Sequence, residues 1–201
     1  MSEGRFSEED LAPSEDDQRA ARAWLYDRLA AGVGVLAAGL VLGGTIALGM
    51  SAAPAVFRLT PRPFSGNAMG VAFASFGQVA LLATCVALVV EVIRTVIHRR
   101  SRPRAWDRVR RLVAIGLAGS AAYLAFNLTP TINGLHAEGV VRGEGDRGAQ
   151  LDAIHKRAEL VGKTEVGLAL ALIFLHVMTL RGPVPEEEAD DIQAPLPPGP
   201  A

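Results

Sequence analysis

The stretch from Leu29 to Phe57 constrains this chain most, because so long an apolar run cannot remain in water. Its first part, up to Met50, contains no charged residue and no Asn, Gln or His. A helix rises about 1.5 Å per residue, so about 20 apolar residues cross a hydrocarbon core of about 30 Å. We therefore expect a membrane-spanning helix in this stretch.

Three further apolar blocks follow, and together they predict an all-α, integral membrane four-helix bundle. Only helices and closed barrels satisfy every backbone polar group in lipid, and the sequence shows no alternating strand pattern. The transmembrane domain is expected to cover residues 22–181, with spans at about residues 29–53, 68–97, 112–128 and 163–180.

The two ends of the chain are polar and are expected to be disordered tails. Residues 1–21 are acidic, and residues 182–201 are acidic and rich in proline. Neither segment has enough apolar surface to offset the entropy lost on ordering. A cleaved secretory signal is not expected, because the apolar run is long and follows an acidic segment.

Prolines and glycines predict where the helices end. Pro54 is expected to end or kink the first helix, with a tight turn over residues 55–67, and Thr129-Pro130 is expected to close the third span. From about Ala149 an amphipathic helical register begins and should run unbroken into the fourth span. Lys163 and Glu165 are expected to mark the outer interface of that span.

The Arg-rich segment, residues 94–111, sets the expected topology. It holds eight arginines and one acidic residue, Asp107. The positive-inside rule places it in the cytoplasm, and with four spans both termini are then cytoplasmic, in a bacterial inner membrane. Anionic lipid headgroups are its expected partner. Nucleic acid is not, because the segment is short and lies between two spans and the net charge of the chain is -1.

Small and ionisable residues within the spans suggest specific contacts. Gly39 and Gly43 form a small-xxx-small pair, which predicts close helix packing within the chain or, alternatively, in a homo-oligomer. Glu91 and Arg94 are three residues apart and are expected to form an ion pair at the interface, the alternative being a carboxylate on a proton path. Cys85, the single cysteine, is expected to be a small buried hydrophobe, the alternative being a metal-binding thiol.

The four histidines are further candidate metal ligands. His98 and His176 are expected on the cytoplasmic side, and His136 and His155 on the outer side. His155 and Glu159 share a helix face, and Asp152 precedes His155 by three residues, so with His136 they are candidate ligands of a metal ion. The alternative is a surface helix with paired charges. We assign no cofactor.

Short motifs recur at the ends of the spans. They include Pro54 and Phe57 after the first span, Pro63 before the second, Pro130 after the third, and His155 at the start of the last helix. These motifs resemble the transmembrane protein 205-like family, whose bacterial members are largely uncharacterised four-span proteins. The resemblance covers roughly residues 25–181 and implies a small α-helical membrane domain without an established reaction. A looser similarity to copper-resistance-type membrane proteins keeps metal handling as an alternative.

Three functions follow from these patterns. The first is a non-enzymatic membrane protein, structural or accessory to transport or stress resistance. The second is a handler of metal, haem or a small solute through the outer histidines. The third is a small pore or transporter, whose sign would be a polar cavity lined by Gln78, Thr84 and Asn127. No Ser/His/Asp arrangement and no phosphate-binding loop is apparent, so we expect no enzymatic activity.

Overall fold

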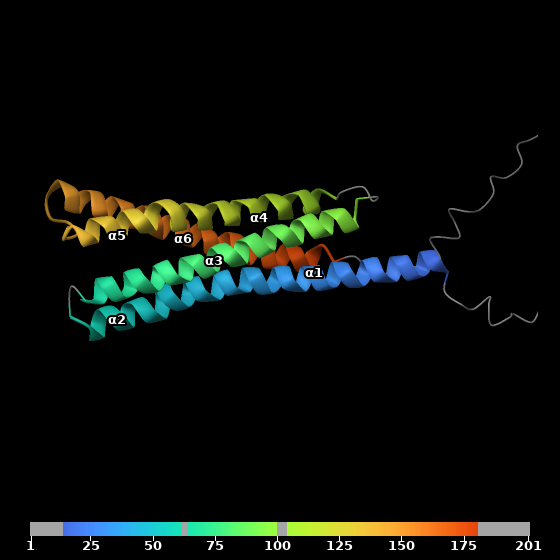
Figure 1. Cartoon of the computed structure of the whole chain (residues 1–201), viewed down its shortest axis with the longest axis horizontal. Helices are drawn as coiled ribbons and strands as arrows, with labels where there is room; N and C mark the ends of the chain where they lie inside the picture. The colour runs from blue at the N-terminus through green and yellow to red at the C-terminus, as the bar shows by residue number, and fades with distance from the viewer. Residues whose placement is uncertain (1–13, 62–63, 100–103, 181–201) are drawn as a thin grey trace, which may run out of the picture.

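The computed structural model describes residues 14–61, 64–99 and 104–180 of the chain. Four long apolar helical rods lie side by side in a bundle (Figure 1), and each is long enough to cross a membrane. The described residues contain no strand. The prediction of an all-α integral membrane bundle is therefore confirmed. The residues of the two predicted tails before residue 14 and after residue 180, and the motif residue Pro63, lie outside the described part of the chain.

Two of the rods are single helices and two contain a short π-helical segment. The second rod is α3 (Phe64–Ile97), and the fourth is α6 (Gly145–Met178). The first rod is made of α1 (Glu15–Ile46), η1 (Ala47–Ala52) and α2 (Ala53–Leu59). The third is made of α4 (Ala105–Tyr123), η2 (Leu124–Leu128) and α5 (Thr129–Ala137).

Helix α1 begins earlier than the sequence suggested. The Ser14 hydroxyl accepts a hydrogen bond from the Asp17 N–H at 3.1 Å, and the Asp17 carboxylate accepts one from the Ser14 N–H at 3.0 Å. This capping box satisfies two backbone donors at the helix start, and the first turn is acidic. Residues 15–21 are thus helical, and the prediction of a disordered tail is wrong for them.

The two motif prolines do not end their helices, contrary to expectation. Pro54 follows η1 and Pro130 follows η2, and in both rods the helix continues beyond the proline, to Leu59 and to Ala137 respectively. A proline removes one backbone donor and crowds the preceding turn, and a π-helical segment is a wider turn that accommodates it. The predicted turn over residues 55–67 is therefore wrong at both ends, because α2 continues to Leu59 and α3 already begins at Phe64.

Small side chains form the core of the bundle. Helix α1 packs against α3 and α6, and α4 packs against the same two helices. Small residues allow helices to approach closely in lipid, where burial of apolar surface adds little driving force. Large side chains such as Leu36, Leu82 and Phe174 instead lie exposed on the outside, where lipid would cover them. The core consists of Ala37, Ala38, Val41, Ala80, Ala83, Ala87, Ala114, Leu117, Ala169 and Leu172.

The glycines of α1 differ in what they face. A Cβ at Gly34 would overlap the ring of His176, and one at Gly44 would overlap the ring of Phe76. A Cβ at Gly39 or Gly43 would meet nothing within 4 Å. The prediction that Gly39 and Gly43 pack closely within the chain is thus wrong, because Gly34 and Gly44 make the close approaches instead.

Two further expectations concern single elements. Helix α6 runs without a break from the connector into the fourth span, as predicted, although it starts at Gly145 rather than near Ala149. The preceding turn uses Gly139 and Gly143 with φ of 77° and 84°, a conformation that favours glycine.

Cys85 is exposed on the surface of α3, so the expectation of a buried cysteine is wrong.

Candidate functional site

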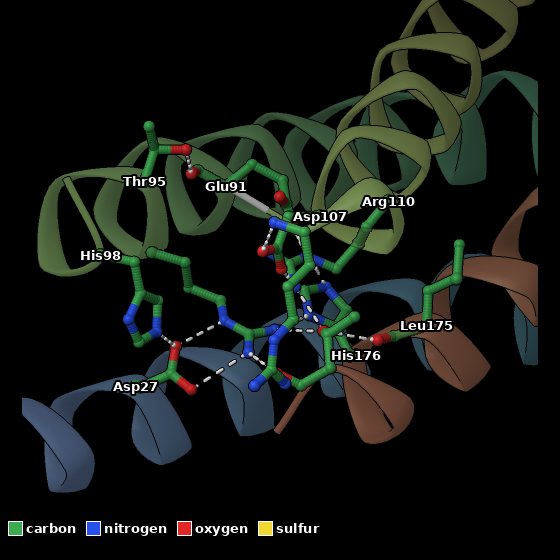
Figure 2. Close-up of polar contacts among 11 residues, drawn as sticks. Asp27, Glu91, Thr95, His98, Asp107, Arg110, Leu175 and His176 are labelled. Atoms are coloured by element: carbon green, nitrogen blue, oxygen red, sulfur yellow. Dashed lines mark hydrogen bonds and ion pairs between the residues drawn. The ribbon is translucent and has the colours of Figure 1, made fainter. Parts of the chain in front are cut away.

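A group of polar side chains, all buried except the half-buried His98, joins all four rods at the end of the bundle where α3 ends and α4 begins. We call this group the ionic network (Figure 2). Charged residues are rarely buried unless they are paired, so this number of them at one place is informative. The ionic network consists of Asp27 from α1, Glu91, Arg94 and His98 from α3, Asp107 and Arg110 from α4, His176 from α6, and Thr179 just after α6.

Arg94 connects α3 to α1 and to the end of α6. Its guanidinium donates to both carboxylate oxygens of Asp27, from Nε at 2.8 Å and from Nη2 at 3.1 Å. Nη2 also donates to the backbone carbonyl of Thr179 at 3.2 Å. The side chains of Arg94 and Asp27 are only 1% and 3% exposed. This fork-like pairing is the strong and directional form of an arginine–carboxylate contact.

Arg110 makes the equivalent connection from α4. Its Nε donates to Glu91 Oε1 at 2.7 Å, and its Nη1 donates to Asp107 Oδ1 at 3.2 Å. Nη1 also donates to the hydroxyl of Thr179. Thr179 therefore accepts from two guanidiniums that belong to different helices, and its own hydroxyl donates back to the Leu175 carbonyl at 2.6 Å. The end of α6 is fixed in this way.

The predicted ion pair between Glu91 and Arg94 is not formed. Both side chains are buried, and each pairs with a different helix: Glu91 with Arg110, and Arg94 with Asp27. Spacing along one helix shows which residues share a face, but it does not show which helix that face meets. Here the face meets both α1 and α4, and partners on those helices replace the partner on the same helix.

Two histidines complete the ionic network. His98 Nε2 lies 2.9 Å from Asp27 Oδ1, and His176 Nδ1 lies 3.1 Å from Arg94 Nη1. A guanidinium can only donate, so Nδ1 of His176 must accept, and the ring is the neutral tautomer with its proton on Nε2. That Nε2 has no hydrogen-bond partner in the described structure, and the nearest Glu91 oxygen is 3.8 Å away. The sequence placed both histidines at this end of the bundle, as observed.

A second polar site lies at the opposite end of the bundle. His136 of α5 and His155 of α6 face each other with their Nε2 atoms 3.4 Å apart and their ring planes tilted by 59°. The prediction that these two histidines share one end is confirmed. Beside them is a cavity of about 400 Å³ lined by Gly66, Asn67, Gly70, Val71, Asn133, His136 and Ala137.

The two carboxylates predicted to join these histidines are paired elsewhere. Asp152 contacts Arg142 at 2.6 Å and Lys156 at 2.8 Å, and Glu159 contacts Lys163 at 2.7 Å. No group of three or more His, Cys, Asp or Glu side chains placed to hold a metal ion occurs in the described ranges. The four-ligand set is therefore wrong, because lysines four residues along α6 compete for its carboxylates.

The polar cavity expected of a pore is not built from the residues that the sequence suggested. Gln78 and Asn127 are exposed on the outside of the bundle. Thr84 is buried, and its hydroxyl donates to the Leu81 carbonyl of its own helix at 2.9 Å. These three side chains therefore do not line a common path.

The sequence reasoning missed the ionic network although a signal was present. Helix α3 carries an acid and an arginine three residues apart, Glu91 and Arg94, and α4 carries another such pair, Asp107 and Arg110. The two pairs flank the connector between α3 and α4, so antiparallel packing brings them to the same level. The Arg-rich segment was interpreted only as a signal of membrane topology, so the pairing between the charged residues of α3 and α4 was not predicted.

The comparisons with known proteins give one match. Residues 36–140, about half of the chain, match a family described as a domain of unknown function (DUF4149). Comparison with curated proteins and with solved structures gives no match. The matched segment contains Glu91, Arg94, Arg110 and His136, and it excludes Asp27, His155 and His176.

Proposed function

This chain belongs to the family of domains of unknown function DUF4149, and we propose that it is a non-enzymatic membrane protein, structural or accessory to transport or stress resistance. The observation that carries this proposal is the ionic network. It joins the first three rods through buried ion pairs and the fourth through hydrogen bonds of Thr179 and His176, so that the arginine donors point at acceptors on other helices. Within this assignment, the short motifs support placing the chain with transmembrane protein 205-like proteins.

The physical argument rests on the two buried arginines. Arg94 and Arg110 each bond to groups on more than one helix, and their side chains are 1% and 2% exposed. Removing one member of a buried ion pair leaves an uncompensated charge, which is far more costly than losing an exposed pair. Such a network holds the helices in one arrangement, which suits a scaffold better than a carrier that must rearrange at this end.

The test of the non-enzymatic proposal is elemental analysis together with an absorption spectrum of the protein purified in its native lipid. We expect no stoichiometric transition metal and no Soret band. A metal or haem in a one-to-one ratio that persists through purification would contradict the proposal. The same preparation with His155→Ala would then show whether the outer histidines hold it.

The topology of the domain is the next part of the proposal. Arg99, Arg104 and Arg108 are exposed at the end of the bundle that holds the ionic network. At the same end the guanidinium of Arg28 lies 4.2 Å from the centre of the Trp24 ring, and Trp106 is 60% exposed. Exposed arginines and tryptophans suit the headgroup region of the cytoplasmic leaflet, so they support contact with anionic lipid there.

Reporter fusions test this topology directly. With both termini in the cytoplasm, green fluorescent protein after residue 201 should fluoresce, and alkaline phosphatase inserted in the turn at Gly143 should be active. Alkaline phosphatase placed in the Arg-rich connector, at residue 102, serves as the control and should be inactive. Active phosphatase at the connector with an inactive enzyme at Gly143 would show the opposite orientation.

The open face around Gly39 and Gly43 supports a homo-oligomer. Both positions have free space where a Cβ would lie. A small-xxx-small pair on the outside of a bundle lets a second helix approach closely in lipid. We therefore propose a second copy of this chain as the partner at this face.

Metal handling is the second candidate function, and one observation favours it. In a tetrahedral zinc site, two bonds of about 2.0–2.1 Å place the ligand nitrogens about 3.4 Å apart. The Nε2 atoms of His136 and His155 are 3.4 Å apart. The two residues therefore fit two positions of a metal ion, and the cavity beside His136 leaves room for water or for the amides of Asn67 and Asn133.

Titration with Zn²⁺ tests this site. We expect His155→Ala and His136→Ala each to lower the affinity of the purified protein for Zn²⁺ by at least about tenfold, because a two-histidine site loses half of its protein ligands. Glu159→Gln is the control, since Glu159 pairs with Lys163 and should not affect binding. Equal affinities in all four proteins would rule the histidine pair out as the site.

A further inference from the structure

Glu165 is a buried ionisable residue that lies outside the ionic network. It lies in α6, is 4% exposed, and its Oε1 is buried without a hydrogen-bond partner in the described structure. The sequence placed it at the outer interface beside Lys163. Lys163 is indeed exposed, but Glu165 faces inward, on the side of α6 that carries Ala169 and Leu172 of the core.

No nearby charged group compensates for a negative charge on Glu165. Lys163 extends outward to Glu159, at 2.7 Å. The parts of the four rods at the same depth in the bundle as Glu165 contain no Asp, Lys, Arg or His and no other Glu. The two other titratable side chains in these parts, Cys85 and Tyr123, are exposed. Those parts are residues 29–57 of the first rod, 64–90 of the second, 112–135 of the third and 166–175 of the fourth.

The nearest polar sites lie along α6 in both directions. His155 precedes Glu165 by ten residues and His176 follows it by eleven. At about 1.5 Å per residue these separations are roughly 15 Å and 17 Å. The charges of the ionic network are therefore too far along the helix to form an ion pair with Glu165, which lies between the two polar ends of the bundle.

An isolated carboxylate in such a place is strongly disfavoured. Burial of an ionised carboxyl without a partner costs so much that the group instead takes up a proton and becomes neutral. In membrane proteins, buried carboxyls of this kind mark proton-binding positions. We propose that Glu165 is a reversible proton-binding site inside the bundle, so that the domain carries a proton-dependent step beyond its structural role.

Packing indicates how the proton would exchange with water. Ala169, Leu172 and His176 follow Glu165 by four, seven and eleven residues, so all four side chains lie along one face of α6. Ala169 and Leu172 are fully buried and fill the space between Glu165 and the ionic network. In this direction the proton can pass only when Ala169 and Leu172 move away from the neighbouring helices, which couples proton exchange with the ionic network to a movement of the helices.

Carbodiimide labelling tests the proposal on the full chain in lipid vesicles. Dicyclohexylcarbodiimide enters lipid and reacts with protonated carboxyl groups. At neutral pH we expect one adduct, located by mass spectrometry on the peptide that contains Glu165. Labelling should decrease as the pH is raised and should return when the pH is lowered again.

Two variants of matched chemistry serve as comparisons. Glu165→Gln should abolish the adduct, and Glu159→Gln, which changes an exposed carboxylate of the same helix, should leave it unchanged. Infrared spectra should show the C=O band of a protonated carboxyl in the wild type and in Glu159→Gln but not in Glu165→Gln. Absence of labelling at Glu165, or labelling and a band that do not respond to pH, would overturn the proposal.

Discussion

Replacement of Arg94 by alanine is expected to lower the free energy of unfolding by about 3–5 kcal/mol, the cost of breaking a buried ion pair by removing one partner. The change leaves Asp27, which is 3% exposed, without its bidentate donor. It also removes the guanidinium that donates hydrogen bonds to His176 Nδ1 and to the Thr179 carbonyl. The free energy can be measured by titrating the detergent-solubilised protein with a denaturing detergent and following helicity.

Arg19 provides the matched control for this experiment. Arg19 also pairs with acidic residues, Glu15 and Asp16, but its side chain is 69% exposed. Exposed pairs contribute at most about 1 kcal/mol, so Arg19→Ala should change the stability little. If Arg94→Ala proved no more destabilising than Arg19→Ala, the buried pair would not hold the bundle together.

Replacement of Gly34 by alanine should produce the second large effect. The new Cβ would overlap the imidazole of His176, which is fully buried and held by the Arg94 guanidinium at 3.1 Å. Because the ring cannot move without breaking that contact, we expect a loss of about 1–3 kcal/mol, typical of overpacking. The same detergent titration measures this loss.

Gly39→Ala is the comparison on the same helix. A Cβ at Gly39 would meet nothing within 4 Å. Alanine is a better helix former than glycine by up to about 1 kcal/mol, so this change should be neutral or stabilising for a single copy of the domain in detergent. A loss at Gly39 as large as that at Gly34 would mean that flexibility of α1, and not contact with His176, determines the effect.

The helical spans could be predicted from the sequence because lipid leaves few alternatives. Long apolar runs in a bilayer must form helices that satisfy their own backbone hydrogen bonds. The ends of the helices were harder, because Pro54 and Pro130 are normally breakers. Both rods remain helical past these prolines because a π-helical segment, η1 or η2, precedes each one. The residue types in these segments do not predict a π-helix.

The polar sites were predictable only in part. The facing of His136 and His155 follows from topology, since both residues flank the same connector. The ion pairs of Asp152 were harder to predict, because two nearby cations, Arg142 and Lys156, both pair with its carboxylate. The ionic network depends on the rotation of each helix about its axis. Spacing within one helix does not fix that rotation, so Glu91 and Arg94 were wrongly paired with each other.

A double-mutant cycle on Asp27 and Arg94 tests the central claim most directly. The claim is that ion pairs between helices hold the four rods together at one end. The cycle compares Asp27→Asn, Arg94→Gln and the double variant by free energy of unfolding in the same detergent. Contacting pairs couple by about 0.5–3 kcal/mol, and for this bidentate pair we predict a value near the upper limit. Additive losses, with a coupling near zero, would contradict the claim.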